Sequence, residues 1–190
     1  MTVLAMRPVT PGMECPDAEI VRRVRGGDVD AYRSLVERYH GRCLRYAVRM
    51  LDNRADAEEV VQDAFTKAYR YLGSYRERDA FAAWLMQILV NEVRTAAVRR
   101  RRDDRALVSL DDASELTAPR GADAESVTDV QQALGRLDPS HREAIVLKYV
   151  DGRTYEDMAV ITGLRVSALK MRVKRARAHL EALLEEWTDD

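Results

Sequence analysis

Near the C-terminus, apolar residues recur at alternating steps of three and four, a spacing that places them on one face of an α-helix. Residues that interrupt helices are few, with nine glycines and five prolines among 190 residues, while strong helix formers such as Ala, Leu and Arg are abundant. The sequence therefore predicts an all-α fold. Its last helix is expected from about Val166 to Glu186, with a stripe made of Val166, Leu169, Val173, Ala176, Leu180, Leu183 and Trp187.

Four helices are expected in the first half of the chain. Their spans are residues 17–25, 30–50 and about 54–72, followed by a fourth helix that Asp79 caps. Asp52 or Asn53 can cap the third of them. The apolar residues expected to face the core are Leu35, Tyr39, Cys43, Tyr46 and Met50 in the second helix, Val60, Val61, Ala64, Phe65, Ala68 and Leu72 in the third, and Phe81, Trp84, Leu85, Ile88 and Leu89 in the fourth.

A segment rich in acidic and turn-forming residues, 103–126, divides the chain. It holds seven acidic and two basic side chains and lacks sustained helical periodicity, which is typical of a flexible linker. The sequence therefore predicts two small helical domains, residues 17–102 and 127–190. The first 16 residues, with three prolines, are expected to form a disordered tail. Further helices of the second domain are expected at 126–137, 141–150 and from Thr154 to Thr162.

The strongest functional signal is a helix–turn–helix between Thr154 and His179. Thr154 and Asp157 form a capping-box pattern, and Gly163 can supply the positive φ of the turn. Between Gly163 and Leu180 there are six Lys or Arg and no acidic residue, which disfavours an ordinary solvated face and favours contact with DNA. The basic residues that share the face opposite the apolar stripe are Lys170, Lys174 and Arg177, with Met171 and Arg175 beside them.

Three further clusters allow both a structural and a functional interpretation. Asp56, Glu59 and Asp63 share one side of a helix, where they either complement its N-terminus or dock a basic protein. The run 99–102 of four arginines suits either a helix C-terminus or phosphate binding. The loop 73–79, with Ser74, Tyr75 and Arg76, could bracket an unpaired base, although a lone loop tyrosine is more often half-packed.

Catalysis has little support in the sequence. The three histidines are isolated, and there is no P-loop, no glycine-rich dinucleotide motif and no cysteine pair with metal-ligand spacing. We therefore expect no enzyme activity, no cofactor and no metal site. Because no apolar run approaches the ~20 residues of a membrane span, we expect a soluble, reduced, cytoplasmic protein with no membrane insertion. Cys43 lies on an apolar stripe and is expected in the core; the sequence does not decide whether Cys15 or Cys43 senses redox state.

Taken in order, these features resemble the bacterial sigma factors of the extracytoplasmic-function type. The polymerase-binding helix of that family is similar to DAEEVVQDAFTKAYRYLGSY, and its promoter-melting, −10-reading helix to FAAWLMQILVNEVRTAAVRRRR. The segment from Leu137 to Leu184 resembles its −35-reading domain, and within it VSALKMRVKRAR is the most specific match. The resemblance covers nearly all of the chain after Asp17.

The resemblance implies partners and a role for each cluster. The partners would be core RNA polymerase, promoter double-stranded DNA, its non-template single strand and an anti-sigma factor, soluble or membrane-bound, that can hold the protein at the inner membrane face. The acidic linker would pass near the RNA exit path. The implied polymerase-binding residues are Asp56, Glu59, Val60, Gln62, Asp63 and Phe65. The −10 element would meet Ser74, Tyr75, Arg76, Asn91, Arg94, Arg99 and Arg100. The −35 bases would meet Lys170, Met171, Lys174 and Arg175, with Arg165 and Arg172 on phosphates.

The sequence departs from the family pattern at three positions. Thr95 stands where an Asp is common, Arg165 where Ser or Pro is common, and Lys174 where an aromatic residue or His is frequent, so promoter preference cannot be borrowed from relatives. Two other functions remain open, an operator-binding regulator that acts without polymerase and a helical adaptor that binds no DNA; a nucleic-acid enzyme is a more distant third. Dependence of promoter binding on polymerase would separate a sigma factor from both.

Overall fold

The computed structural model describes residues 15–76, 80–108 and 129–188, and every regular element in these ranges is helical. This confirms the all-α prediction. The elements of the first half are α1 (Asp17–Arg25), α2 (Ala31–Leu51), α3 (Arg54–Tyr71), the 3₁₀ turn η1 (Leu72–Ser74) and α4 (Phe81–Val108). Those of the second half are α5 (Asp129–Arg136), α6 (Pro139–Ile145), the π-helical turn η2 (Val146–Val150), α7 (Tyr155–Thr162) and α8 (Val166–Thr188).

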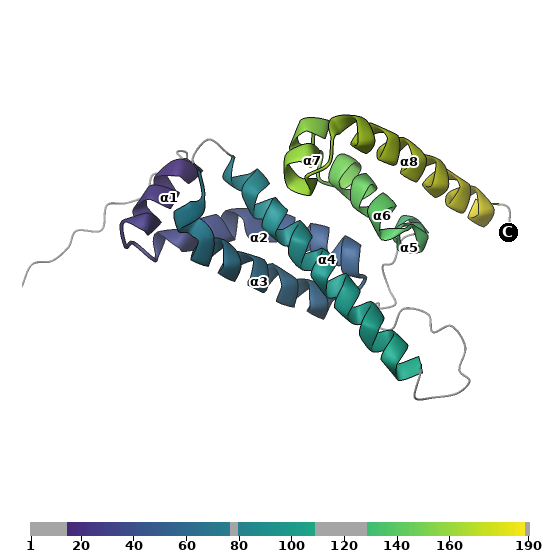
Figure 1. Cartoon of the computed structure of the whole chain (residues 1–190), viewed down its shortest axis with the longest axis horizontal. Helices are drawn as coiled ribbons and strands as arrows, with labels where there is room; N and C mark the ends of the chain where they lie inside the picture. Colours follow the sequence, from purple (N-terminus) through teal and green to yellow (C-terminus); the bar gives the residue numbers. More distant parts are fainter. Residues whose placement is uncertain (1–14, 77–79, 109–128, 189–190) are drawn as a thin grey trace, which may run out of the picture.

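The first domain is a bundle in which α3 packs between α2 and α4, and α1 packs on α2 (Figure 1). The apolar stripes expected from the sequence meet in its core, where Leu35, Tyr46, Phe81 and Leu89 are all at most 2% exposed. Cys43 is also buried, as expected, and burial raises the pKa of its thiol to about 12. A thiol with so high a pKa is almost entirely protonated and unreactive near neutral pH.

Local chemistry explains where α2 ends and α3 begins. Asp52 takes a left-handed conformation with φ of 55°, which terminates α2. Asn53 then caps α3, because its side-chain oxygen accepts hydrogen bonds from the backbone amides of Ala55 (2.8 Å) and Asp56 (3.3 Å). Of the two residues that could cap α3, Asn53 therefore does so, and Asp52 ends the helix before it.

The second domain contains the predicted helix–turn–helix, α7 followed by α8. Thr154 and Asp157 form the capping box, and Gly163 adopts φ of 74° in the turn between the helices. Asp138 caps α6 by accepting from the Ser140 amide, as its position before Pro139 suggests. A separate small core forms where α5, α6 and α8 meet, made of Leu134, Leu137, Ile145 and Ala176.

Two predicted helices have different extents in the structure. The helix expected over 141–150 is α-helical only to Ile145 and continues as the π turn η2. Helix α4 runs six residues into the segment assigned to the linker, because Asp103–Val108 contains no Pro or Gly and each added residue gains a backbone hydrogen bond. The rest of the predicted linker, the N-terminal tail to residue 14 and the expected cap Asp79 lie outside the described residues.

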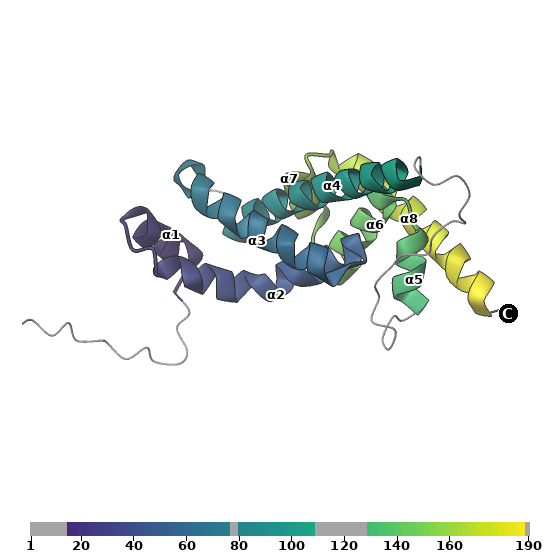
Figure 2. The same cartoon turned by 90° about the horizontal axis from the view of Figure 1, so that it is seen from below.

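The two domains pack against each other, which the sequence did not predict. Helix α7 packs against α4, and η2, α5 and α6 contact α2. Figure 2 shows the second domain lying along the first, with α7 behind α4. One continuous apolar cluster joins the domains and includes Leu147, Met158 and Ile161 from the second. Side chains that belong to separate functional surfaces in the sequence are therefore neighbours in this arrangement.

Candidate nucleic-acid interface

The basic face of α8 lies opposite its buried stripe, as the spacing predicted. Leu169, Val173 and Ala176 are at most 3% exposed and anchor the helix. The predicted base-contacting residues are all exposed, and Arg172 is half-buried at the edge of the face. Arg165 is exposed just before the helix and its carbonyl accepts from the Leu169 amide (3.0 Å), so its side chain stands at the helix N-terminus. The residues exposed together on this face are Lys170, Met171, Lys174 and Arg175.

Tyr155 supports the start of the basic face. The ammonium of Lys148 lies 4.6 Å from the centre of its ring, and that of Lys170 lies 5.7 Å from the same ring. Farther along α8, Arg177 pairs with Glu181 (3.1 Å), so the charge of this arginine is partly neutralised. The positive face is therefore strongest between Arg165 and Arg175, where the sequence placed the DNA contacts.

Three of the predicted −10 residues on α4 are already engaged in ion pairs. Asn91 is exposed, but the Arg94 guanidinium donates two hydrogen bonds, of 2.9 and 2.8 Å, to the Glu143 carboxylate of α6. This pairing raises the pKa of Arg94 above its ordinary value. Arg94 and Arg99 also line an open groove on α4, together with Thr95, Val98 and Arg102.

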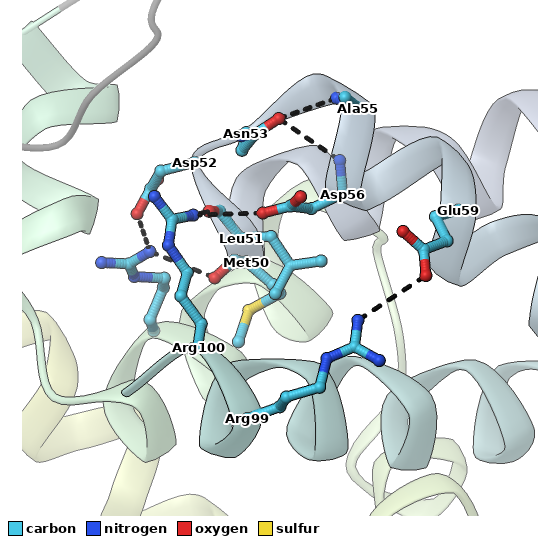
Figure 3. Close-up of polar contacts among 10 residues, drawn as sticks. Met50, Leu51, Asp52, Asn53, Ala55, Asp56, Glu59, Arg99 and Arg100 are labelled. Atoms are coloured by element: carbon cyan, nitrogen blue, oxygen red, sulfur yellow. Dashed lines mark hydrogen bonds and ion pairs between the residues drawn. The ribbon is translucent and has the colours of Figure 1, made fainter. Parts of the chain in front are cut away.

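Arg99 and Arg100 reach toward the start of α3 (Figure 3). Arg100 donates to the Leu51 carbonyl at 3.0 Å and to the Asp56 carboxylate at 3.4 Å, so it satisfies the C-terminal end of α2. Arg99 lies 3.6 Å from Glu59, and both side chains are more than half exposed. The predicted phosphate-binding arginines and the predicted polymerase-docking acids are thus direct neighbours.

The predicted polymerase-binding residues differ in exposure. Glu59, Gln62 and Asp63 are exposed on α3, and Asp56 is half-buried beside Arg100. Val60 and Phe65 are only 5% and 6% exposed and belong to the bundle core, where they position α3 and are not available to a partner. Their burial agrees with the apolar stripe expected from the sequence, whereas the partner contact was implied only by the family resemblance.

Tyr75, predicted to bracket a base, is packed in the interior and is 5% exposed. Its ring centre lies 5.1 Å from that of Trp84 and 5.8 Å from that of Phe81. The structural interpretation considered for this tyrosine therefore holds, whereas Ser74 and Arg76 on either side of it are exposed.

The chain matches known proteins over both domains. The profile of sigma-70 region 2 matches residues 35–103, and that of sigma-70 region 4 matches residues 128–180. The sigma-H factor of Pseudomonas aeruginosa is 32% identical over 181 residues, which cover 89% of this chain and 94% of that protein. The extracytoplasmic-function (ECF) sigma factor SigM of Mycobacterium tuberculosis is 35% identical over 173 residues, covering 90% and 86%.

The chain belongs to the ECF sigma factors. Its fold agrees with that of the sigma factor RpoE of Bartonella quintana, solved in complex with the anti-sigma factor NepR, at a TM-score of 0.67 and 29% identity, with 81% of this chain and 96% of that chain covered. As a sigma factor, it directs RNA polymerase to promoters for transcription initiation. None of the described helices is long and apolar enough to cross a membrane.

The structure of this sigma factor also brings together residues that the sequence did not connect. His141 and His179 were expected to be isolated, but their rings meet edge to face with centres 5.2 Å apart. Glu143, Arg142 and Arg25 were not singled out, although each holds a segment of the candidate interfaces. There was little signal in the sequence for Arg142 and Glu143, because they follow the polar Ser140 and His141 in α6 and look like part of a solvated helix start.

Proposed function

We propose that the two domains of this sigma factor divide promoter recognition between them. Residues 17–102 would bind the polymerase and open the −10 element, and residues 127–190 would read the −35 element. The observation that carries this proposal is the basic face of α8 between Lys170 and Arg175, which stands opposite the buried Leu169, Val173 and Ala176. A helix anchored in this way can enter the major groove without losing its packing. We assign the synthesis of RNA to the core polymerase and not to this chain.

At the −35 element, we assign the bases to the exposed centre of the α8 face. Lys170, Lys174 and Arg175 can donate to base edges, and Met171 supplies apolar contact. Arg165 and Arg172 lie at the margin of this face and suit phosphates. Beside Arg165, the N-terminus of α8 also favours negative charge.

At the −10 element, the exposed Ser74 and Arg76 would meet an extruded base, while the buried Tyr75 would support them. Extruding a base costs a few kcal/mol of stacking, which contacts in the protein offset. Asn91, Arg94, Arg99 and Arg100 would lie along the strand. Arg94, Arg99 and Arg100 pair with Glu143, Glu59 and Asp56 in the present arrangement, so full use of their donors by DNA requires these pairs to be exchanged.

For the polymerase, we assign the exposed Glu59, Gln62 and Asp63 of α3, together with the half-buried Asp56 that pairs with Arg100. These groups would face a basic surface of the large subunit, since complementary charge sets the register of such contacts. An anti-sigma factor would restrain the protein by covering the same surfaces, as supported by the likeness to RpoE, solved with NepR. Because the polymerase acts in the cytoplasm, we place the protein there, with an anti-sigma factor able to retain it at the inner membrane face.

Run-off transcription with purified core polymerase and a promoter library tests the proposed function. Discrete starts that appear only when this protein is added would support it. If no transcripts appear and the protein alone protects specific DNA, an operator-binding regulator replaces the proposal. Binding to an acidic protein without any DNA effect would instead favour the adaptor.

Reversing the charge of Asp63 is expected to reduce run-off transcription about tenfold or more, because Asp63→Lys would set like charges against each other at the polymerase contact. Asp63 is exposed, so folding should be unaffected. Glu37→Lys, on the exposed side of α2, is the matched control and should retain activity. Equal affinity of wild type and Asp63→Lys for core polymerase would contradict the assignment of this surface.

Truncating Lys174 is expected to change promoter preference. A lost base contact costs about 1–3 kcal/mol at one base pair and little elsewhere. Arg172→Ala should instead weaken binding at all promoters alike and reduce the salt-dependence slope by about one. The measurement is transcription from −35 variants at several salt concentrations. Identical selectivity profiles for wild type and Lys174→Ala would show that Lys174 does not read bases.

A further inference from the structure

Arg25, the last residue of α1, binds the backbone of the turn after α3, where the loop proposed to meet the −10 element begins. Its Nε and Nη2 atoms donate to the Leu72 carbonyl at 3.0 and 2.7 Å. Nη2 also lies 3.4 Å from the Gly73 carbonyl and donates to the Tyr75 carbonyl. The Arg25 guanidinium thus donates to three carbonyls of a turn that lies 47 to 50 residues away in sequence.

These carbonyls lie just after the end of α3, where a helix leaves oxygens without intrahelical partners. The Leu72 carbonyl accepts from the Tyr75 amide at 3.3 Å and has a second lone pair for Arg25. A planar guanidinium suits the position, because its donors are fixed in a fork and each charge-assisted bond is stronger than a neutral one. The path of the backbone from Leu72 to Tyr75 therefore depends on a residue of α1.

The same segment is held from its other side by aromatic packing. The Tyr75 ring contacts Phe81 and Trp84, and the Arg25 guanidinium lies 5.9 Å from the centre of the Tyr75 ring. On either side of Tyr75 along the chain, Ser74 and Arg76 remain exposed. The segment is rigid at its base and presents polar groups at its surface, as a site that reads a base requires.

We propose that Arg25 is a positioning residue for base recognition in the −10 element: it orients Ser74 and Arg76 through the backbone that it binds, without contacting DNA itself. This inference rests on the proposed function of the loop in base capture. A residue that only tethers α1 would change stability when replaced. A positioning residue would also change which base is preferred.

The test compares Arg25→Gln and Arg25→Lys with the control Arg23→Gln, which removes the same charge from the same helix but breaks only an exposed pair with Asp28. Each protein is assayed with core polymerase on the best-transcribed promoter of the library, with every non-template −10 base varied in turn. Duplex and pre-melted templates are both used. Thermal unfolding and core-polymerase affinity are measured in parallel.

Arg25→Gln is expected to lower the base-discrimination ratio at one −10 position about tenfold on both templates, since small displacements of positioned groups have effects up to about a hundredfold. Arg25→Lys, which keeps the charge but not the fork, should recover part of the ratio, and Arg23→Gln should retain it. If both Arg25 variants discriminate between bases as the wild type does, Arg25 is not a positioning residue, but the proposal of base capture by the loop stands. Absence of base discrimination by the wild type would overturn base capture by the loop and this inference together.

Discussion

Arg142→Ala is expected to lower the free energy of unfolding by about 3 kcal/mol, because it removes one partner of a largely buried ion pair. Arg142 is 7% exposed and donates to the Asp52 carboxylate, to the Gly135 carbonyl and to the Met50 carbonyl (3.3 Å). Its loss leaves these three acceptors without this donor at the contact between the domains. The Asp52 side chain is 27% exposed, so water will offset part of the cost.

Urea denaturation followed by circular dichroism measures this effect. In the wild type, the shared apolar cluster predicts one cooperative transition for both domains, and Arg142→Ala should shift this single transition to lower urea concentration. Arg70→Ala, an exposed arginine of α3, is the control. Asp52→Asn combined with Arg142→Met should recover stability relative to Arg142→Ala, because Asn tolerates the left-handed conformation and no charge is left unpaired. A loss below about 1 kcal/mol in Arg142→Ala would mean that the pair contributes no more than an exposed one.

The pair between Arg94 and Glu143 is expected to respond very differently to loss of its two members. Arg94→Ala would leave the Glu143 carboxylate, whose side chain is 6% exposed, without its cation. Such uncompensated buried charges cost about 3–5 kcal/mol, and separation of the domains would relieve the cost by hydrating the acid. Glu143→Ala would leave Arg94, whose side chain is already 43% exposed, so the loss should be at most about 1 kcal/mol.

The two variants should also differ in their shape and in their DNA binding. Small-angle scattering should give a larger radius of gyration for Arg94→Ala than for the wild type. Glu143→Ala should strengthen binding of the protein alone to single-stranded −10 DNA, because the freed Arg94 guanidinium can bind a phosphate. The double variant isolates the coupling between the two residues. Equal destabilisation by both single variants would contradict the asymmetry in burial on which this prediction rests.

The arrangement of the domains explains why these two pairs matter. While Nε and Nη2 of Arg94 donate to Glu143, this guanidinium cannot offer the same pair of donors to a phosphate. Under the proposed function, use of that donor pair by DNA would require the second domain to move relative to the first. Core polymerase supplies the binding free energy for such a change if it holds the domains apart.

Features set by short stretches of chain were predictable from the sequence. The capping box of Thr154 and Asp157, the turn at Gly163 and the amphipathic stripe of α8 all form as expected, because their hydrogen bonds and spacing involve neighbours within one or two helical turns. The choice between Asp52 and Asn53 as a cap was left open, since either side chain can accept the same amides.

Long-range contacts were decided only by the tertiary structure. The family resemblance implied partner contacts for Phe65 and Tyr75, but packing buries both, in agreement for Phe65 with its place on the apolar stripe. Arg100 meets the end of α2 as well as solvent. The bonds of Arg25 to the turn after α3 and of Arg94 to Glu143 join residues 47 to 50 positions apart. The sequence by itself determined where the helices lie, to within a few residues, and which stretches are basic or acidic, because these depend on local spacing. Which charges remain free for DNA or polymerase depends on how the helices pack, and only the folded chain decides it.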